Sequence, residues 1–507
     1  MNKQEFLDKV TDQISYRPLR PEIRRELEEH MEDRAAEYEA QGLSSQEAEQ
    51  RAVEAMGDAV SIGMQINAVR HLQKSPVLIF LTIALLFSGC AASAYMFWLP
   101  EQVANGFLYY VPGAAVFLIT VYWGYPLFIR FRKPIALVIG AVLGALMLLR
   151  MLLYAGLITI WGMSPSFYYF SLLSAALLFP LILYGICRRS PLRFFLSSAG
   201  FAFLCLACYP LNPFNPGSAC LIASMAAAGT GIFMMARGKL SLTGISHSPR
   251  EKRITGLLFL AGIGLLIGSN FLSPGQRHGW NYFLHPEKNI VSKWDDTYNS
   301  VLIKELLSRT PALGGISLTP EEMMAYGTGE WYFAERDPEQ ISLVRSDYPD
   351  EESFAQAWKA SSTFRGIVYY NETNVTLYDI LPQHYHNNYL ISLLIFQYGW
   401  IPGLLFLGLI GGYYLCLFSR IGKIRQPLAS SLAFCCGLLL LGQTILYVLG
   451  NFGFQYHAFP VLPLLSEGRV SIMVNMFFLG FIFSAYRYDR VSGFFTHVFT
   501  EALPWQP

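Results

Sequence analysis

Long apolar stretches separated by short polar connections dominate the chain from residue 76 to residue 486. A helix needs about 20 apolar residues to cross about 30 Å of hydrocarbon, and about ten stretches reach that length. The sequence therefore predicts an all-α fold, a polytopic membrane bundle of about ten transmembrane helices. The expected spans are 76–98, 106–129, 134–160, 166–187, 193–211, 215–236, 254–273, 387–418, 427–449 and 469–486.

The connections between these spans alternate between basic and nearly uncharged. Short loops rich in Lys and Arg stay in the cytoplasm. With ten spans, every basic connection falls on one side of the membrane, which predicts a multi-pass protein with both termini cytoplasmic. The basic positions are Arg130, Arg132 and Lys133; Arg188, Arg189 and Arg193; residues 237–253; Arg420, Lys423 and Arg425; and Arg487 with Arg490.

Two polar segments interrupt the apolar pattern, and they predict two further parts. Residues 1–74, here called the head, are expected to form a cytoplasmic helical domain, because Ser44 and Glu47 form a capping box and Gly42 and Gly57 are typical helix ends. Residues 75–507 would be the membrane domain. Its connection 274–386, the outer loop, is too long for a passive link, and long ordered loops usually carry function.

Composition supports a membrane protein and excludes several alternatives. Hydrophobic residues make up 53 % of the chain and charged residues 14 %, against roughly 25 % charged in soluble domains. A net charge of +1 leaves no basic face for a nucleic acid. All eight cysteines lie in or beside apolar runs, so no disulfide-built outer module is expected. Because the first 70 residues are polar, the first apolar stretch is expected to act as the insertion signal.

Three short motifs stand near the expected outer ends of the spans. They are residues 386–389 (His-Asn-Asn-Tyr), 451–453 (Asn-Phe-Gly) and 462–471 (Leu-Pro-Leu-Leu-Ser-Glu-Gly-Arg-Val-Ser). In order and spacing they resemble motifs of the SEDS family (shape, elongation, division and sporulation; the RodA, FtsW and SpoVE type). The resemblance covers residues 76–490 in architecture. It implies ten helices with a large outer loop, polymerisation of lipid II glycan strands, and a lipid-flipping role that has also been proposed.

The chain departs from the family where that family's chemistry is ascribed. The resemblance places the family's catalytic aspartate at Asn388, and its paired glutamates at Phe396 and Gln397. A carboxamide cannot take a proton from an attacking sugar hydroxyl. The departures therefore indicate altered or absent polymerase chemistry. In an active enzyme another residue, such as Asp379 or His386, would have to act as the base.

The head resembles a second family, the permease-prefix (HAAS) domain. The matching residues are 26–33, 42–48 and 55–58, within a resemblance that spans about 17–72. It implies a cytoplasmic interaction module of Gram-positive bacteria without chemistry of its own. We therefore expect a bacterial plasma membrane protein with a cytoplasmic partner bound through the head.

Several polar residues near or within the spans are candidate binding groups. Arg150 lies inside an expected span, where a charge is costly, so it either grips an anionic substrate or snorkels and pairs structurally. His384 and His386, with Asp379 nearby, form either a metal or acid/base site or a solvated, capping pair at a helix start.

In the last motif, the resemblance implies that Ser466, Glu467 and Arg469 line the family's central cavity. The latter two either pair with each other or contact substrate. We assign no metal and no cofactor.

Three functions follow from these observations. The first is a divergent SEDS-type protein of peptidoglycan synthesis in division, elongation or sporulation, which engages a lipid-linked glycan precursor and a penicillin-binding transpeptidase. The second is a non-catalytic scaffold or regulator of wall synthesis. The third is a transporter of a lipid-linked substrate, which would need an external energy source because the chain has no nucleotide-binding loop.

Overall fold

In the residues that it describes, the computed structural model is α-helical apart from one sheet of two short strands. It describes residues 1–96, 100–154, 166–187, 217–237, 249–272, 274–290, 296–326, 385–457, 460–466 and 468–491, with isolated residues and short pieces between them. These residues form two compact units. One contains residues 1–283, 406–449 and 455–507, and the other contains 284–405 with 450–454. We call the second the loop unit.

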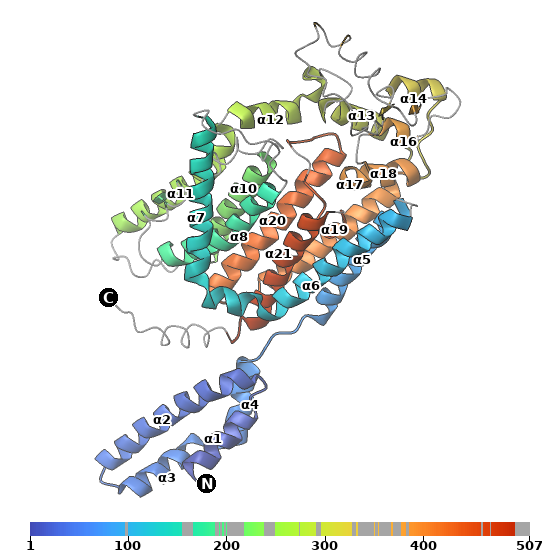
Figure 1. Cartoon of the computed structure of the whole chain (residues 1–507). Helices are drawn as coiled ribbons and strands as arrows, with labels where there is room; N and C mark the ends of the chain where they lie inside the picture. Colours follow the sequence, from blue (N-terminus) through green and yellow to red (C-terminus); the bar gives the residue numbers. More distant parts are fainter. Residues whose placement is uncertain are drawn as a thin grey trace, which may run out of the picture. The chain divides into compact units, whose positions relative to one another are not determined.

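The head consists of four short helices around a small apolar core (Figure 1). They are α1 (Lys3–Asp12), α2 (Arg20–Ala40), α3 (Ser45–Met56) and α4 (Ala59–Val69), with a 3-10 turn at Arg17–Leu19. Phe6, Leu7 and Val10 are fully buried. The expected capping box is present, since the Glu47 N–H donates to Ser44 Oγ and the Ser44 N–H to Glu47 Oε2. Gly42 and Gly57 both have the positive φ of helix-ending glycines.

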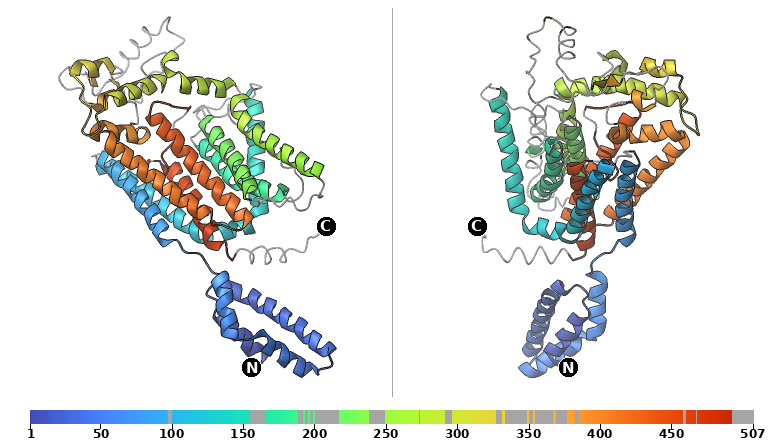
Figure 2. Two further views of the ribbon diagram at one scale, coloured as in Figure 1. Left: turned by 180° about the vertical axis from the view of Figure 1, so that it is seen from behind. Right: turned by 45° about the vertical axis from the view of Figure 1, so that its right-hand side comes forward.

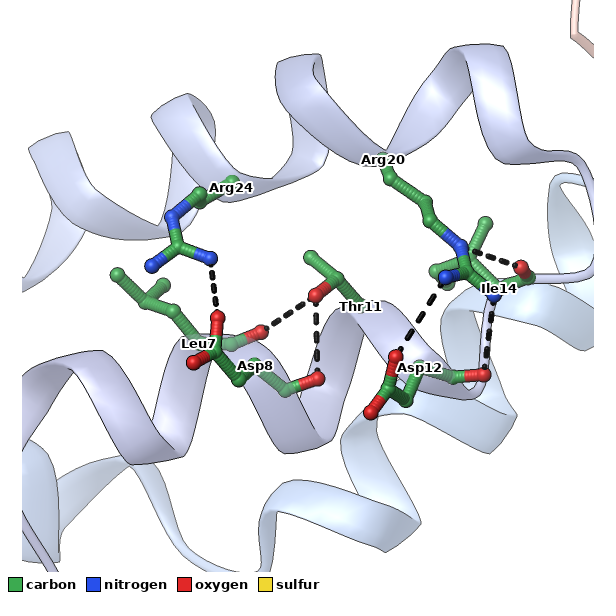
Figure 3. A network of polar contacts seen from close by, with 7 residues as sticks. All are labelled: Leu7, Asp8, Thr11, Asp12, Ile14, Arg20 and Arg24. Atoms are coloured by element: carbon green, nitrogen blue, oxygen red, sulfur yellow. Dashed lines mark hydrogen bonds and ion pairs between the residues drawn. The ribbon is translucent and has the colours of Figure 1, made fainter.

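Polar contacts join α1 to α2 at the rim of this core (Figure 3). Arg24 pairs with Asp8, and Arg20 pairs with Asp12 at 3.4 Å. The Arg20 Nε also donates to the Ile14 carbonyl at 3.1 Å. Because exposed ion pairs contribute about 0–1 kcal/mol, the buried apolar residues supply most of the head's stability.

The long apolar helices pass along one another as a bundle (Figures 1 and 2). They are α5 (Pro76–Met96), α6 (Pro100–Arg130), α7 (Arg132–Tyr154), α8 (Ser166–Cys187), α10 (Gly217–Ala236), α11 (Pro249–Leu272), α19 (Trp400–Ile421), α20 (Pro427–Asn451) and α21 (Arg469–Tyr488).

Among the described residues, five helical segments are long and apolar enough to cross a membrane, or six if a pair bent by 73° counts as one span. The bent pair is Gly256–Leu272 with Gln276–Leu284, the latter within α12 (Pro274–Leu284). A multi-pass membrane protein is thus confirmed, whereas ten spans and the orientation of the termini stay predictions. The expected span 193–211 lies almost entirely outside the described residues.

Helices α6 and α21 lie in close contact because glycines and exchanged hydrogen bonds line their interface. A Cβ on Gly480 would lie 2.5 Å from Thr120 Cβ, and a Cβ on Gly113 would lie 2.4 Å from Ile472 Cγ2. Pro126 has no N–H for the Tyr122 carbonyl one turn earlier. The Tyr488 hydroxyl donates to that carbonyl instead, at 2.6 Å, so the carbonyl freed by the proline keeps a hydrogen-bond partner.

The loop unit is built from short helices. They are η3 (Pro286–Lys288), α13 (Asp296–Arg309), α14 (Pro320–Tyr326), α16 (Leu377–Ile380), α17 (Tyr385–Asn388) and α18 (Leu390–Tyr398). Its two strands, β1 (Trp331–Tyr332) and β2 (Ile367–Val368), pair antiparallel.

One expected span is broken in the structure. The prediction of a single helix over 387–418 was wrong, because the chain ends α18 and starts α19 at Gly399, whose φ is +96°. Residues 311–316 run along the break: the Gly314 N–H donates to the Tyr398 carbonyl at 3.0 Å and the Trp400 N–H to the Pro311 carbonyl at 3.1 Å. A Cβ at position 399 would lie 2.7 Å from the Ala312 carbonyl oxygen, so this approach requires glycine.

Candidate functional site

Two of the three sequence motifs meet inside the loop unit. Asn451 is fully buried, and its side-chain oxygen accepts hydrogen bonds from the Ser392 N–H and hydroxyl, both at 3.0 Å. The same hydroxyl lies 2.7 Å from the Asn451 carbonyl. The Asn451 amide donates to the Asn388 carbonyl at 2.9 Å. We call Asn388, Ser392, Asn451 and Gly453 the motif junction.

Gly453 lets this junction pack against α13. Its φ is +79°, and a Cβ at this position would lie 2.4 Å from the Ser300 carbonyl oxygen and 2.5 Å from Lys304 Cγ. Any side chain would therefore collide with the helix backbone and be strained. Beside the glycine, the Phe452 ring stacks on Trp400 with centroids 5.9 Å apart. The Asn-Phe-Gly motif is thus a close-packed turn that holds α13 and α18 together.

Asn388 takes part in the junction only through its backbone carbonyl. Its side chain is half-buried, and the structure records no hydrogen bond for the side-chain amide among the residues it describes. The amide can donate and accept hydrogen bonds but cannot remove a proton. At this position the chain can orient a polar ligand, and it lacks the base of the SEDS pattern.

The other predicted catalytic residues are only partly described. His386 lies in α17 and Asp379 in α16, and neither side chain is among the described ones. His384 lies outside the described residues altogether. Their proposed roles as base or ligand stay predictions.

The third motif folds as a tight turn in the other unit. Ser466 is buried, its hydroxyl accepts the Leu462 N–H at 3.0 Å, and its own N–H donates to the Leu462 carbonyl at 2.9 Å. Leu464, with φ +76°, lies inside this turn. Ser466 therefore has a clear structural role, and substrate contact by it stays a prediction.

The side chains of the remaining predicted binding residues lie outside the described part of the structure. Glu467 lies outside the described residues. Arg469 opens α21 and Arg150 lies in α7, but neither side chain is described. A pair between Glu467 and Arg469 and a ligand contact of Arg150 therefore stay predictions.

Sequence reasoning missed Ser392 and Lys304, which the structure places at the motif junction. Ser392 is a polar residue in an apolar run, four residues after Asn388, and that position was the available sequence signal. The structure buries it fully. Lys304 lies one turn after Ser300 in α13, and its Nζ is 4.0 Å from the centroid of the Phe454 ring. Burial lowers the pKa of Lys304 from its ordinary value.

A second polar cluster, also missed, surrounds His457 in the other unit. A Cβ on Gly217 or Gly279 would lie 2.3 Å or 2.0 Å from the imidazole ring, so the ring occupies a slot between two glycines. Tyr456 packs edge-on against the ring and bonds to the Gln276 side chain. Burial, with the nearby charge of His278, lowers the pKa of His457 to about 4. His457 is therefore neutral at physiological pH.

Metal-ligand geometry is missing from the part of the chain that the structure describes, where no three His, Cys, Asp or Glu side chains come together.

Comparison with known proteins returns little. No protein-family profile matches the chain, and no curated protein matches it. Among solved structures, one chain from work described as the structural coordination of polymerization and crosslinking by a peptidoglycan synthase complex aligns with a TM-score of 0.48 and 15 % identity, over 82 % of this chain and 98 % of that one. These values are too low to assign a family or an activity, so the function has to come from the chain's own residues.

Proposed function

We propose that this protein acts in bacterial cell-wall synthesis as a divergent SEDS-type membrane protein that engages a lipid-linked glycan precursor through its loop unit. The motif junction is the observation that carries this proposal. Residues 386–389 and 451–453 both resemble motifs of the family, and the Asn451 amide joins these two distant segments by donating a part-buried hydrogen bond to the Asn388 carbonyl. A chance likeness in sequence would give no reason for the two motifs to lie next to each other in the structure.

In this proposal the loop unit binds the precursor without autonomous polymerisation. Glycosyl transfer needs a base that takes the proton of the attacking hydroxyl. Asn388 cannot take it, but its half-buried amide can hold a sugar hydroxyl or an amide by hydrogen bonds. If the protein does polymerise, His386 or Asp379 has to act as the base.

Partners follow from the same resemblance. A penicillin-binding transpeptidase is the expected membrane partner, and a cytoplasmic protein is the expected partner of the head. A role as a non-catalytic scaffold of wall synthesis uses the same partners, and it differs only in that the junction binds no precursor.

Transport of a lipid-linked substrate is a second candidate, and one observation favours it. The segments Gly256–Leu272 and Gln276–Leu284 form a span bent by 73°, and broken helices often line substrate sites in transporters. Transport would move labelled precursor across liposomes without forming polymer.

Polymerisation of labelled lipid II by the purified full-length chain tests the proposal. We expect precursor binding but no polymer from the wild type. Restoring the carboxylate with Asn388→Asp should bring detectable glycan synthesis, because it replaces a carboxamide by a base, while Asn387→Asp one residue earlier should not. Polymer from the wild type would contradict binding without polymerisation. No binding of lipid II at all would contradict the precursor role and favour the scaffold.

A further inference from the structure

Lys304 lies flat across the turn of the motif junction. A Cβ on Gly453 would be 2.5 Å from Lys304 Cγ and 3.1 Å from its Cε, so the aliphatic part of the lysine covers the glycine. The ammonium group ends 4.0 Å from the centroid of the Phe454 ring. Phe454 is 37 % exposed, so the charged end of Lys304 lies at an accessible edge of the junction.

No carboxylate in the described part of the loop unit forms an ion pair with this ammonium group, and Glu287 acts on it only through its charge from farther away. The structure records neither an ion pair nor a hydrogen bond for Lys304 Nζ. The nearest acidic residue in sequence, Glu305, is engaged by Arg309 at 3.0 Å, and Arg309 also binds Glu322 at 2.6 Å. Lys304 therefore keeps three N–H donors for another acceptor.

The surroundings of Lys304 favour the binding of an anion to its ammonium group over contact with water. Burial lowers the pKa of Lys304, and the charge of Glu287 offsets only part of this lowering. Because the charge of Glu287 compensates only part of the cost of burying this cation, a bound anion recovers interaction energy that exposed lysines do not offer. The cation–π contact with Phe454 holds the side chain in place.

We propose that Lys304, held between Gly453 and Phe454, is a binding subsite for an anionic oxygen group of the ligand. This subsite deepens the proposed function, on which the identity of the ligand rests. A lipid-linked glycan precursor offers two such groups, the diphosphate that joins the lipid to the sugar and the carboxylates of its peptide. Lysine binds either as a compact charge with three donors.

The test is equilibrium binding to the purified full-length protein in detergent, with three probes: undecaprenyl diphosphate, uncharged undecaprenol and a free stem peptide. Lys304→Gln should weaken binding of one anionic probe about tenfold or more, since a charge-assisted hydrogen bond contributes about 1.5–3 kcal/mol. Undecaprenol should bind equally to both forms. Lys304→Arg should keep most of the affinity because it keeps the charge.

Lys288→Gln is the matched control, because Lys288 is an exposed lysine of the same unit, and it should change none of the affinities. If Lys304→Gln weakens the binding of undecaprenyl diphosphate alone, the bound anion is the diphosphate. If it weakens the binding of the stem peptide alone, the bound anion is a carboxylate. Equal affinity of Lys304→Gln and wild type for both anionic probes would overturn the subsite. So would an equal loss for undecaprenol, or no binding of either anion by the wild type.

The outcomes also separate this inference from the proposed function. A selective loss in Lys304→Gln without any polymer from wild type or Asn388→Asp would leave the subsite intact and remove the glycan-synthesis chemistry. If Lys304→Gln leaves the binding of lipid II unchanged, the subsite is overturned while the proposed binding of the precursor stands.

Discussion

At the residue scale, the fully buried Asn451 is a position where loss of one side chain should lower the free energy of unfolding substantially. The Asn451 side chain bonds to the Ser392 N–H and to the Asn388 carbonyl, two groups that lie in separate helices. A buried group left without its partner costs about 1–3 kcal/mol. The junction is thus a structural clamp as well as the candidate ligand site.

Asn451→Ala should therefore destabilise the full-length protein by about 2–4 kcal/mol, because it orphans two buried backbone groups. Thermal unfolding in detergent measures this loss. Asn388→Ala is the matched control, since Asn451 bonds to the backbone carbonyl that alanine keeps; it should change stability little. Similar unfolding temperatures for Asn451→Ala and Asn388→Ala would contradict the clamp.

His457 predicts how stability depends on pH. Its pKa is about 4 in the folded protein, below the value of about 6.5 for an unperturbed histidine, so folding favours the neutral imidazole. The contribution of His457 is complete above pH about 6.5 and is lost as pH falls towards 4.

The unfolding temperature of the wild type should therefore fall as the pH is lowered from 6.5 to 4. The drop should shrink in His278→Gln, because the charge of His278 contributes to the lowered pKa of His457. An unfolding temperature of the wild type that does not change over this range, or a steeper fall in His278→Gln, would show that folding does not favour the neutral form of His457.

The candidate residues that the structure brings together were predicted from sequence motifs. Asn388 and Asn451 come from recognisable segments, and the structure brings both to one place. Lys304 and His457 come from no motif; Lys304 depends on a turn supplied by residues far along the chain, and His457 on glycines of two other helices. Such placements follow from tertiary packing, which periodicity does not encode.

At the element scale, proline and tyrosine form a matched pair between α6 and α21. Pro126 leaves the Tyr122 carbonyl without its helical partner, and Tyr488 supplies the missing donor at 2.6 Å. Helix α6 continues past Pro126 because a residue of α21 donates a hydrogen bond to the Tyr122 carbonyl.

Tyr488→Phe should destabilise the protein by about 1 kcal/mol, in keeping with hydrogen bonds inside membrane bundles. In a Pro126→Ala background the same substitution should cost less, because alanine restores the N–H for the Tyr122 carbonyl. Unfolding measurements on the two single variants and the double variant form a double-mutant cycle. A coupling energy of zero would contradict the pairing.

Helix boundaries were predicted well where apolar length alone decides them. The expected spans 215–236 and 427–449 nearly coincide with α10 and α20. The span 387–418 was wrong because Gly399 ends α18 under the constraint of residues 311–316. That segment lies in a distant part of the chain, so an apolar window that covers both helices cannot show the break.

At the scale of the whole molecule, composition and charge pattern predicted a multi-pass membrane protein, and the described helices agree. The division into a head and a membrane domain stays a prediction. The compact units instead separate the loop unit, which takes in residues 450–454 as well as 284–405. That short second piece belongs there because Asn451 and Gly453 pack against α18 and α13.

The central claim is that the loop unit binds a lipid-linked glycan precursor at the motif junction. The most direct measurement is photo-crosslinking of the full-length protein in membranes with a lipid II analogue that carries a photoreactive sugar, followed by peptide mapping. We predict adducts within residues 296–309, 385–398 or 450–454, competed by unlabelled lipid II and reduced in Asn451→Ala. Competed adducts confined to other parts of the chain, or no competed adduct, would contradict the account.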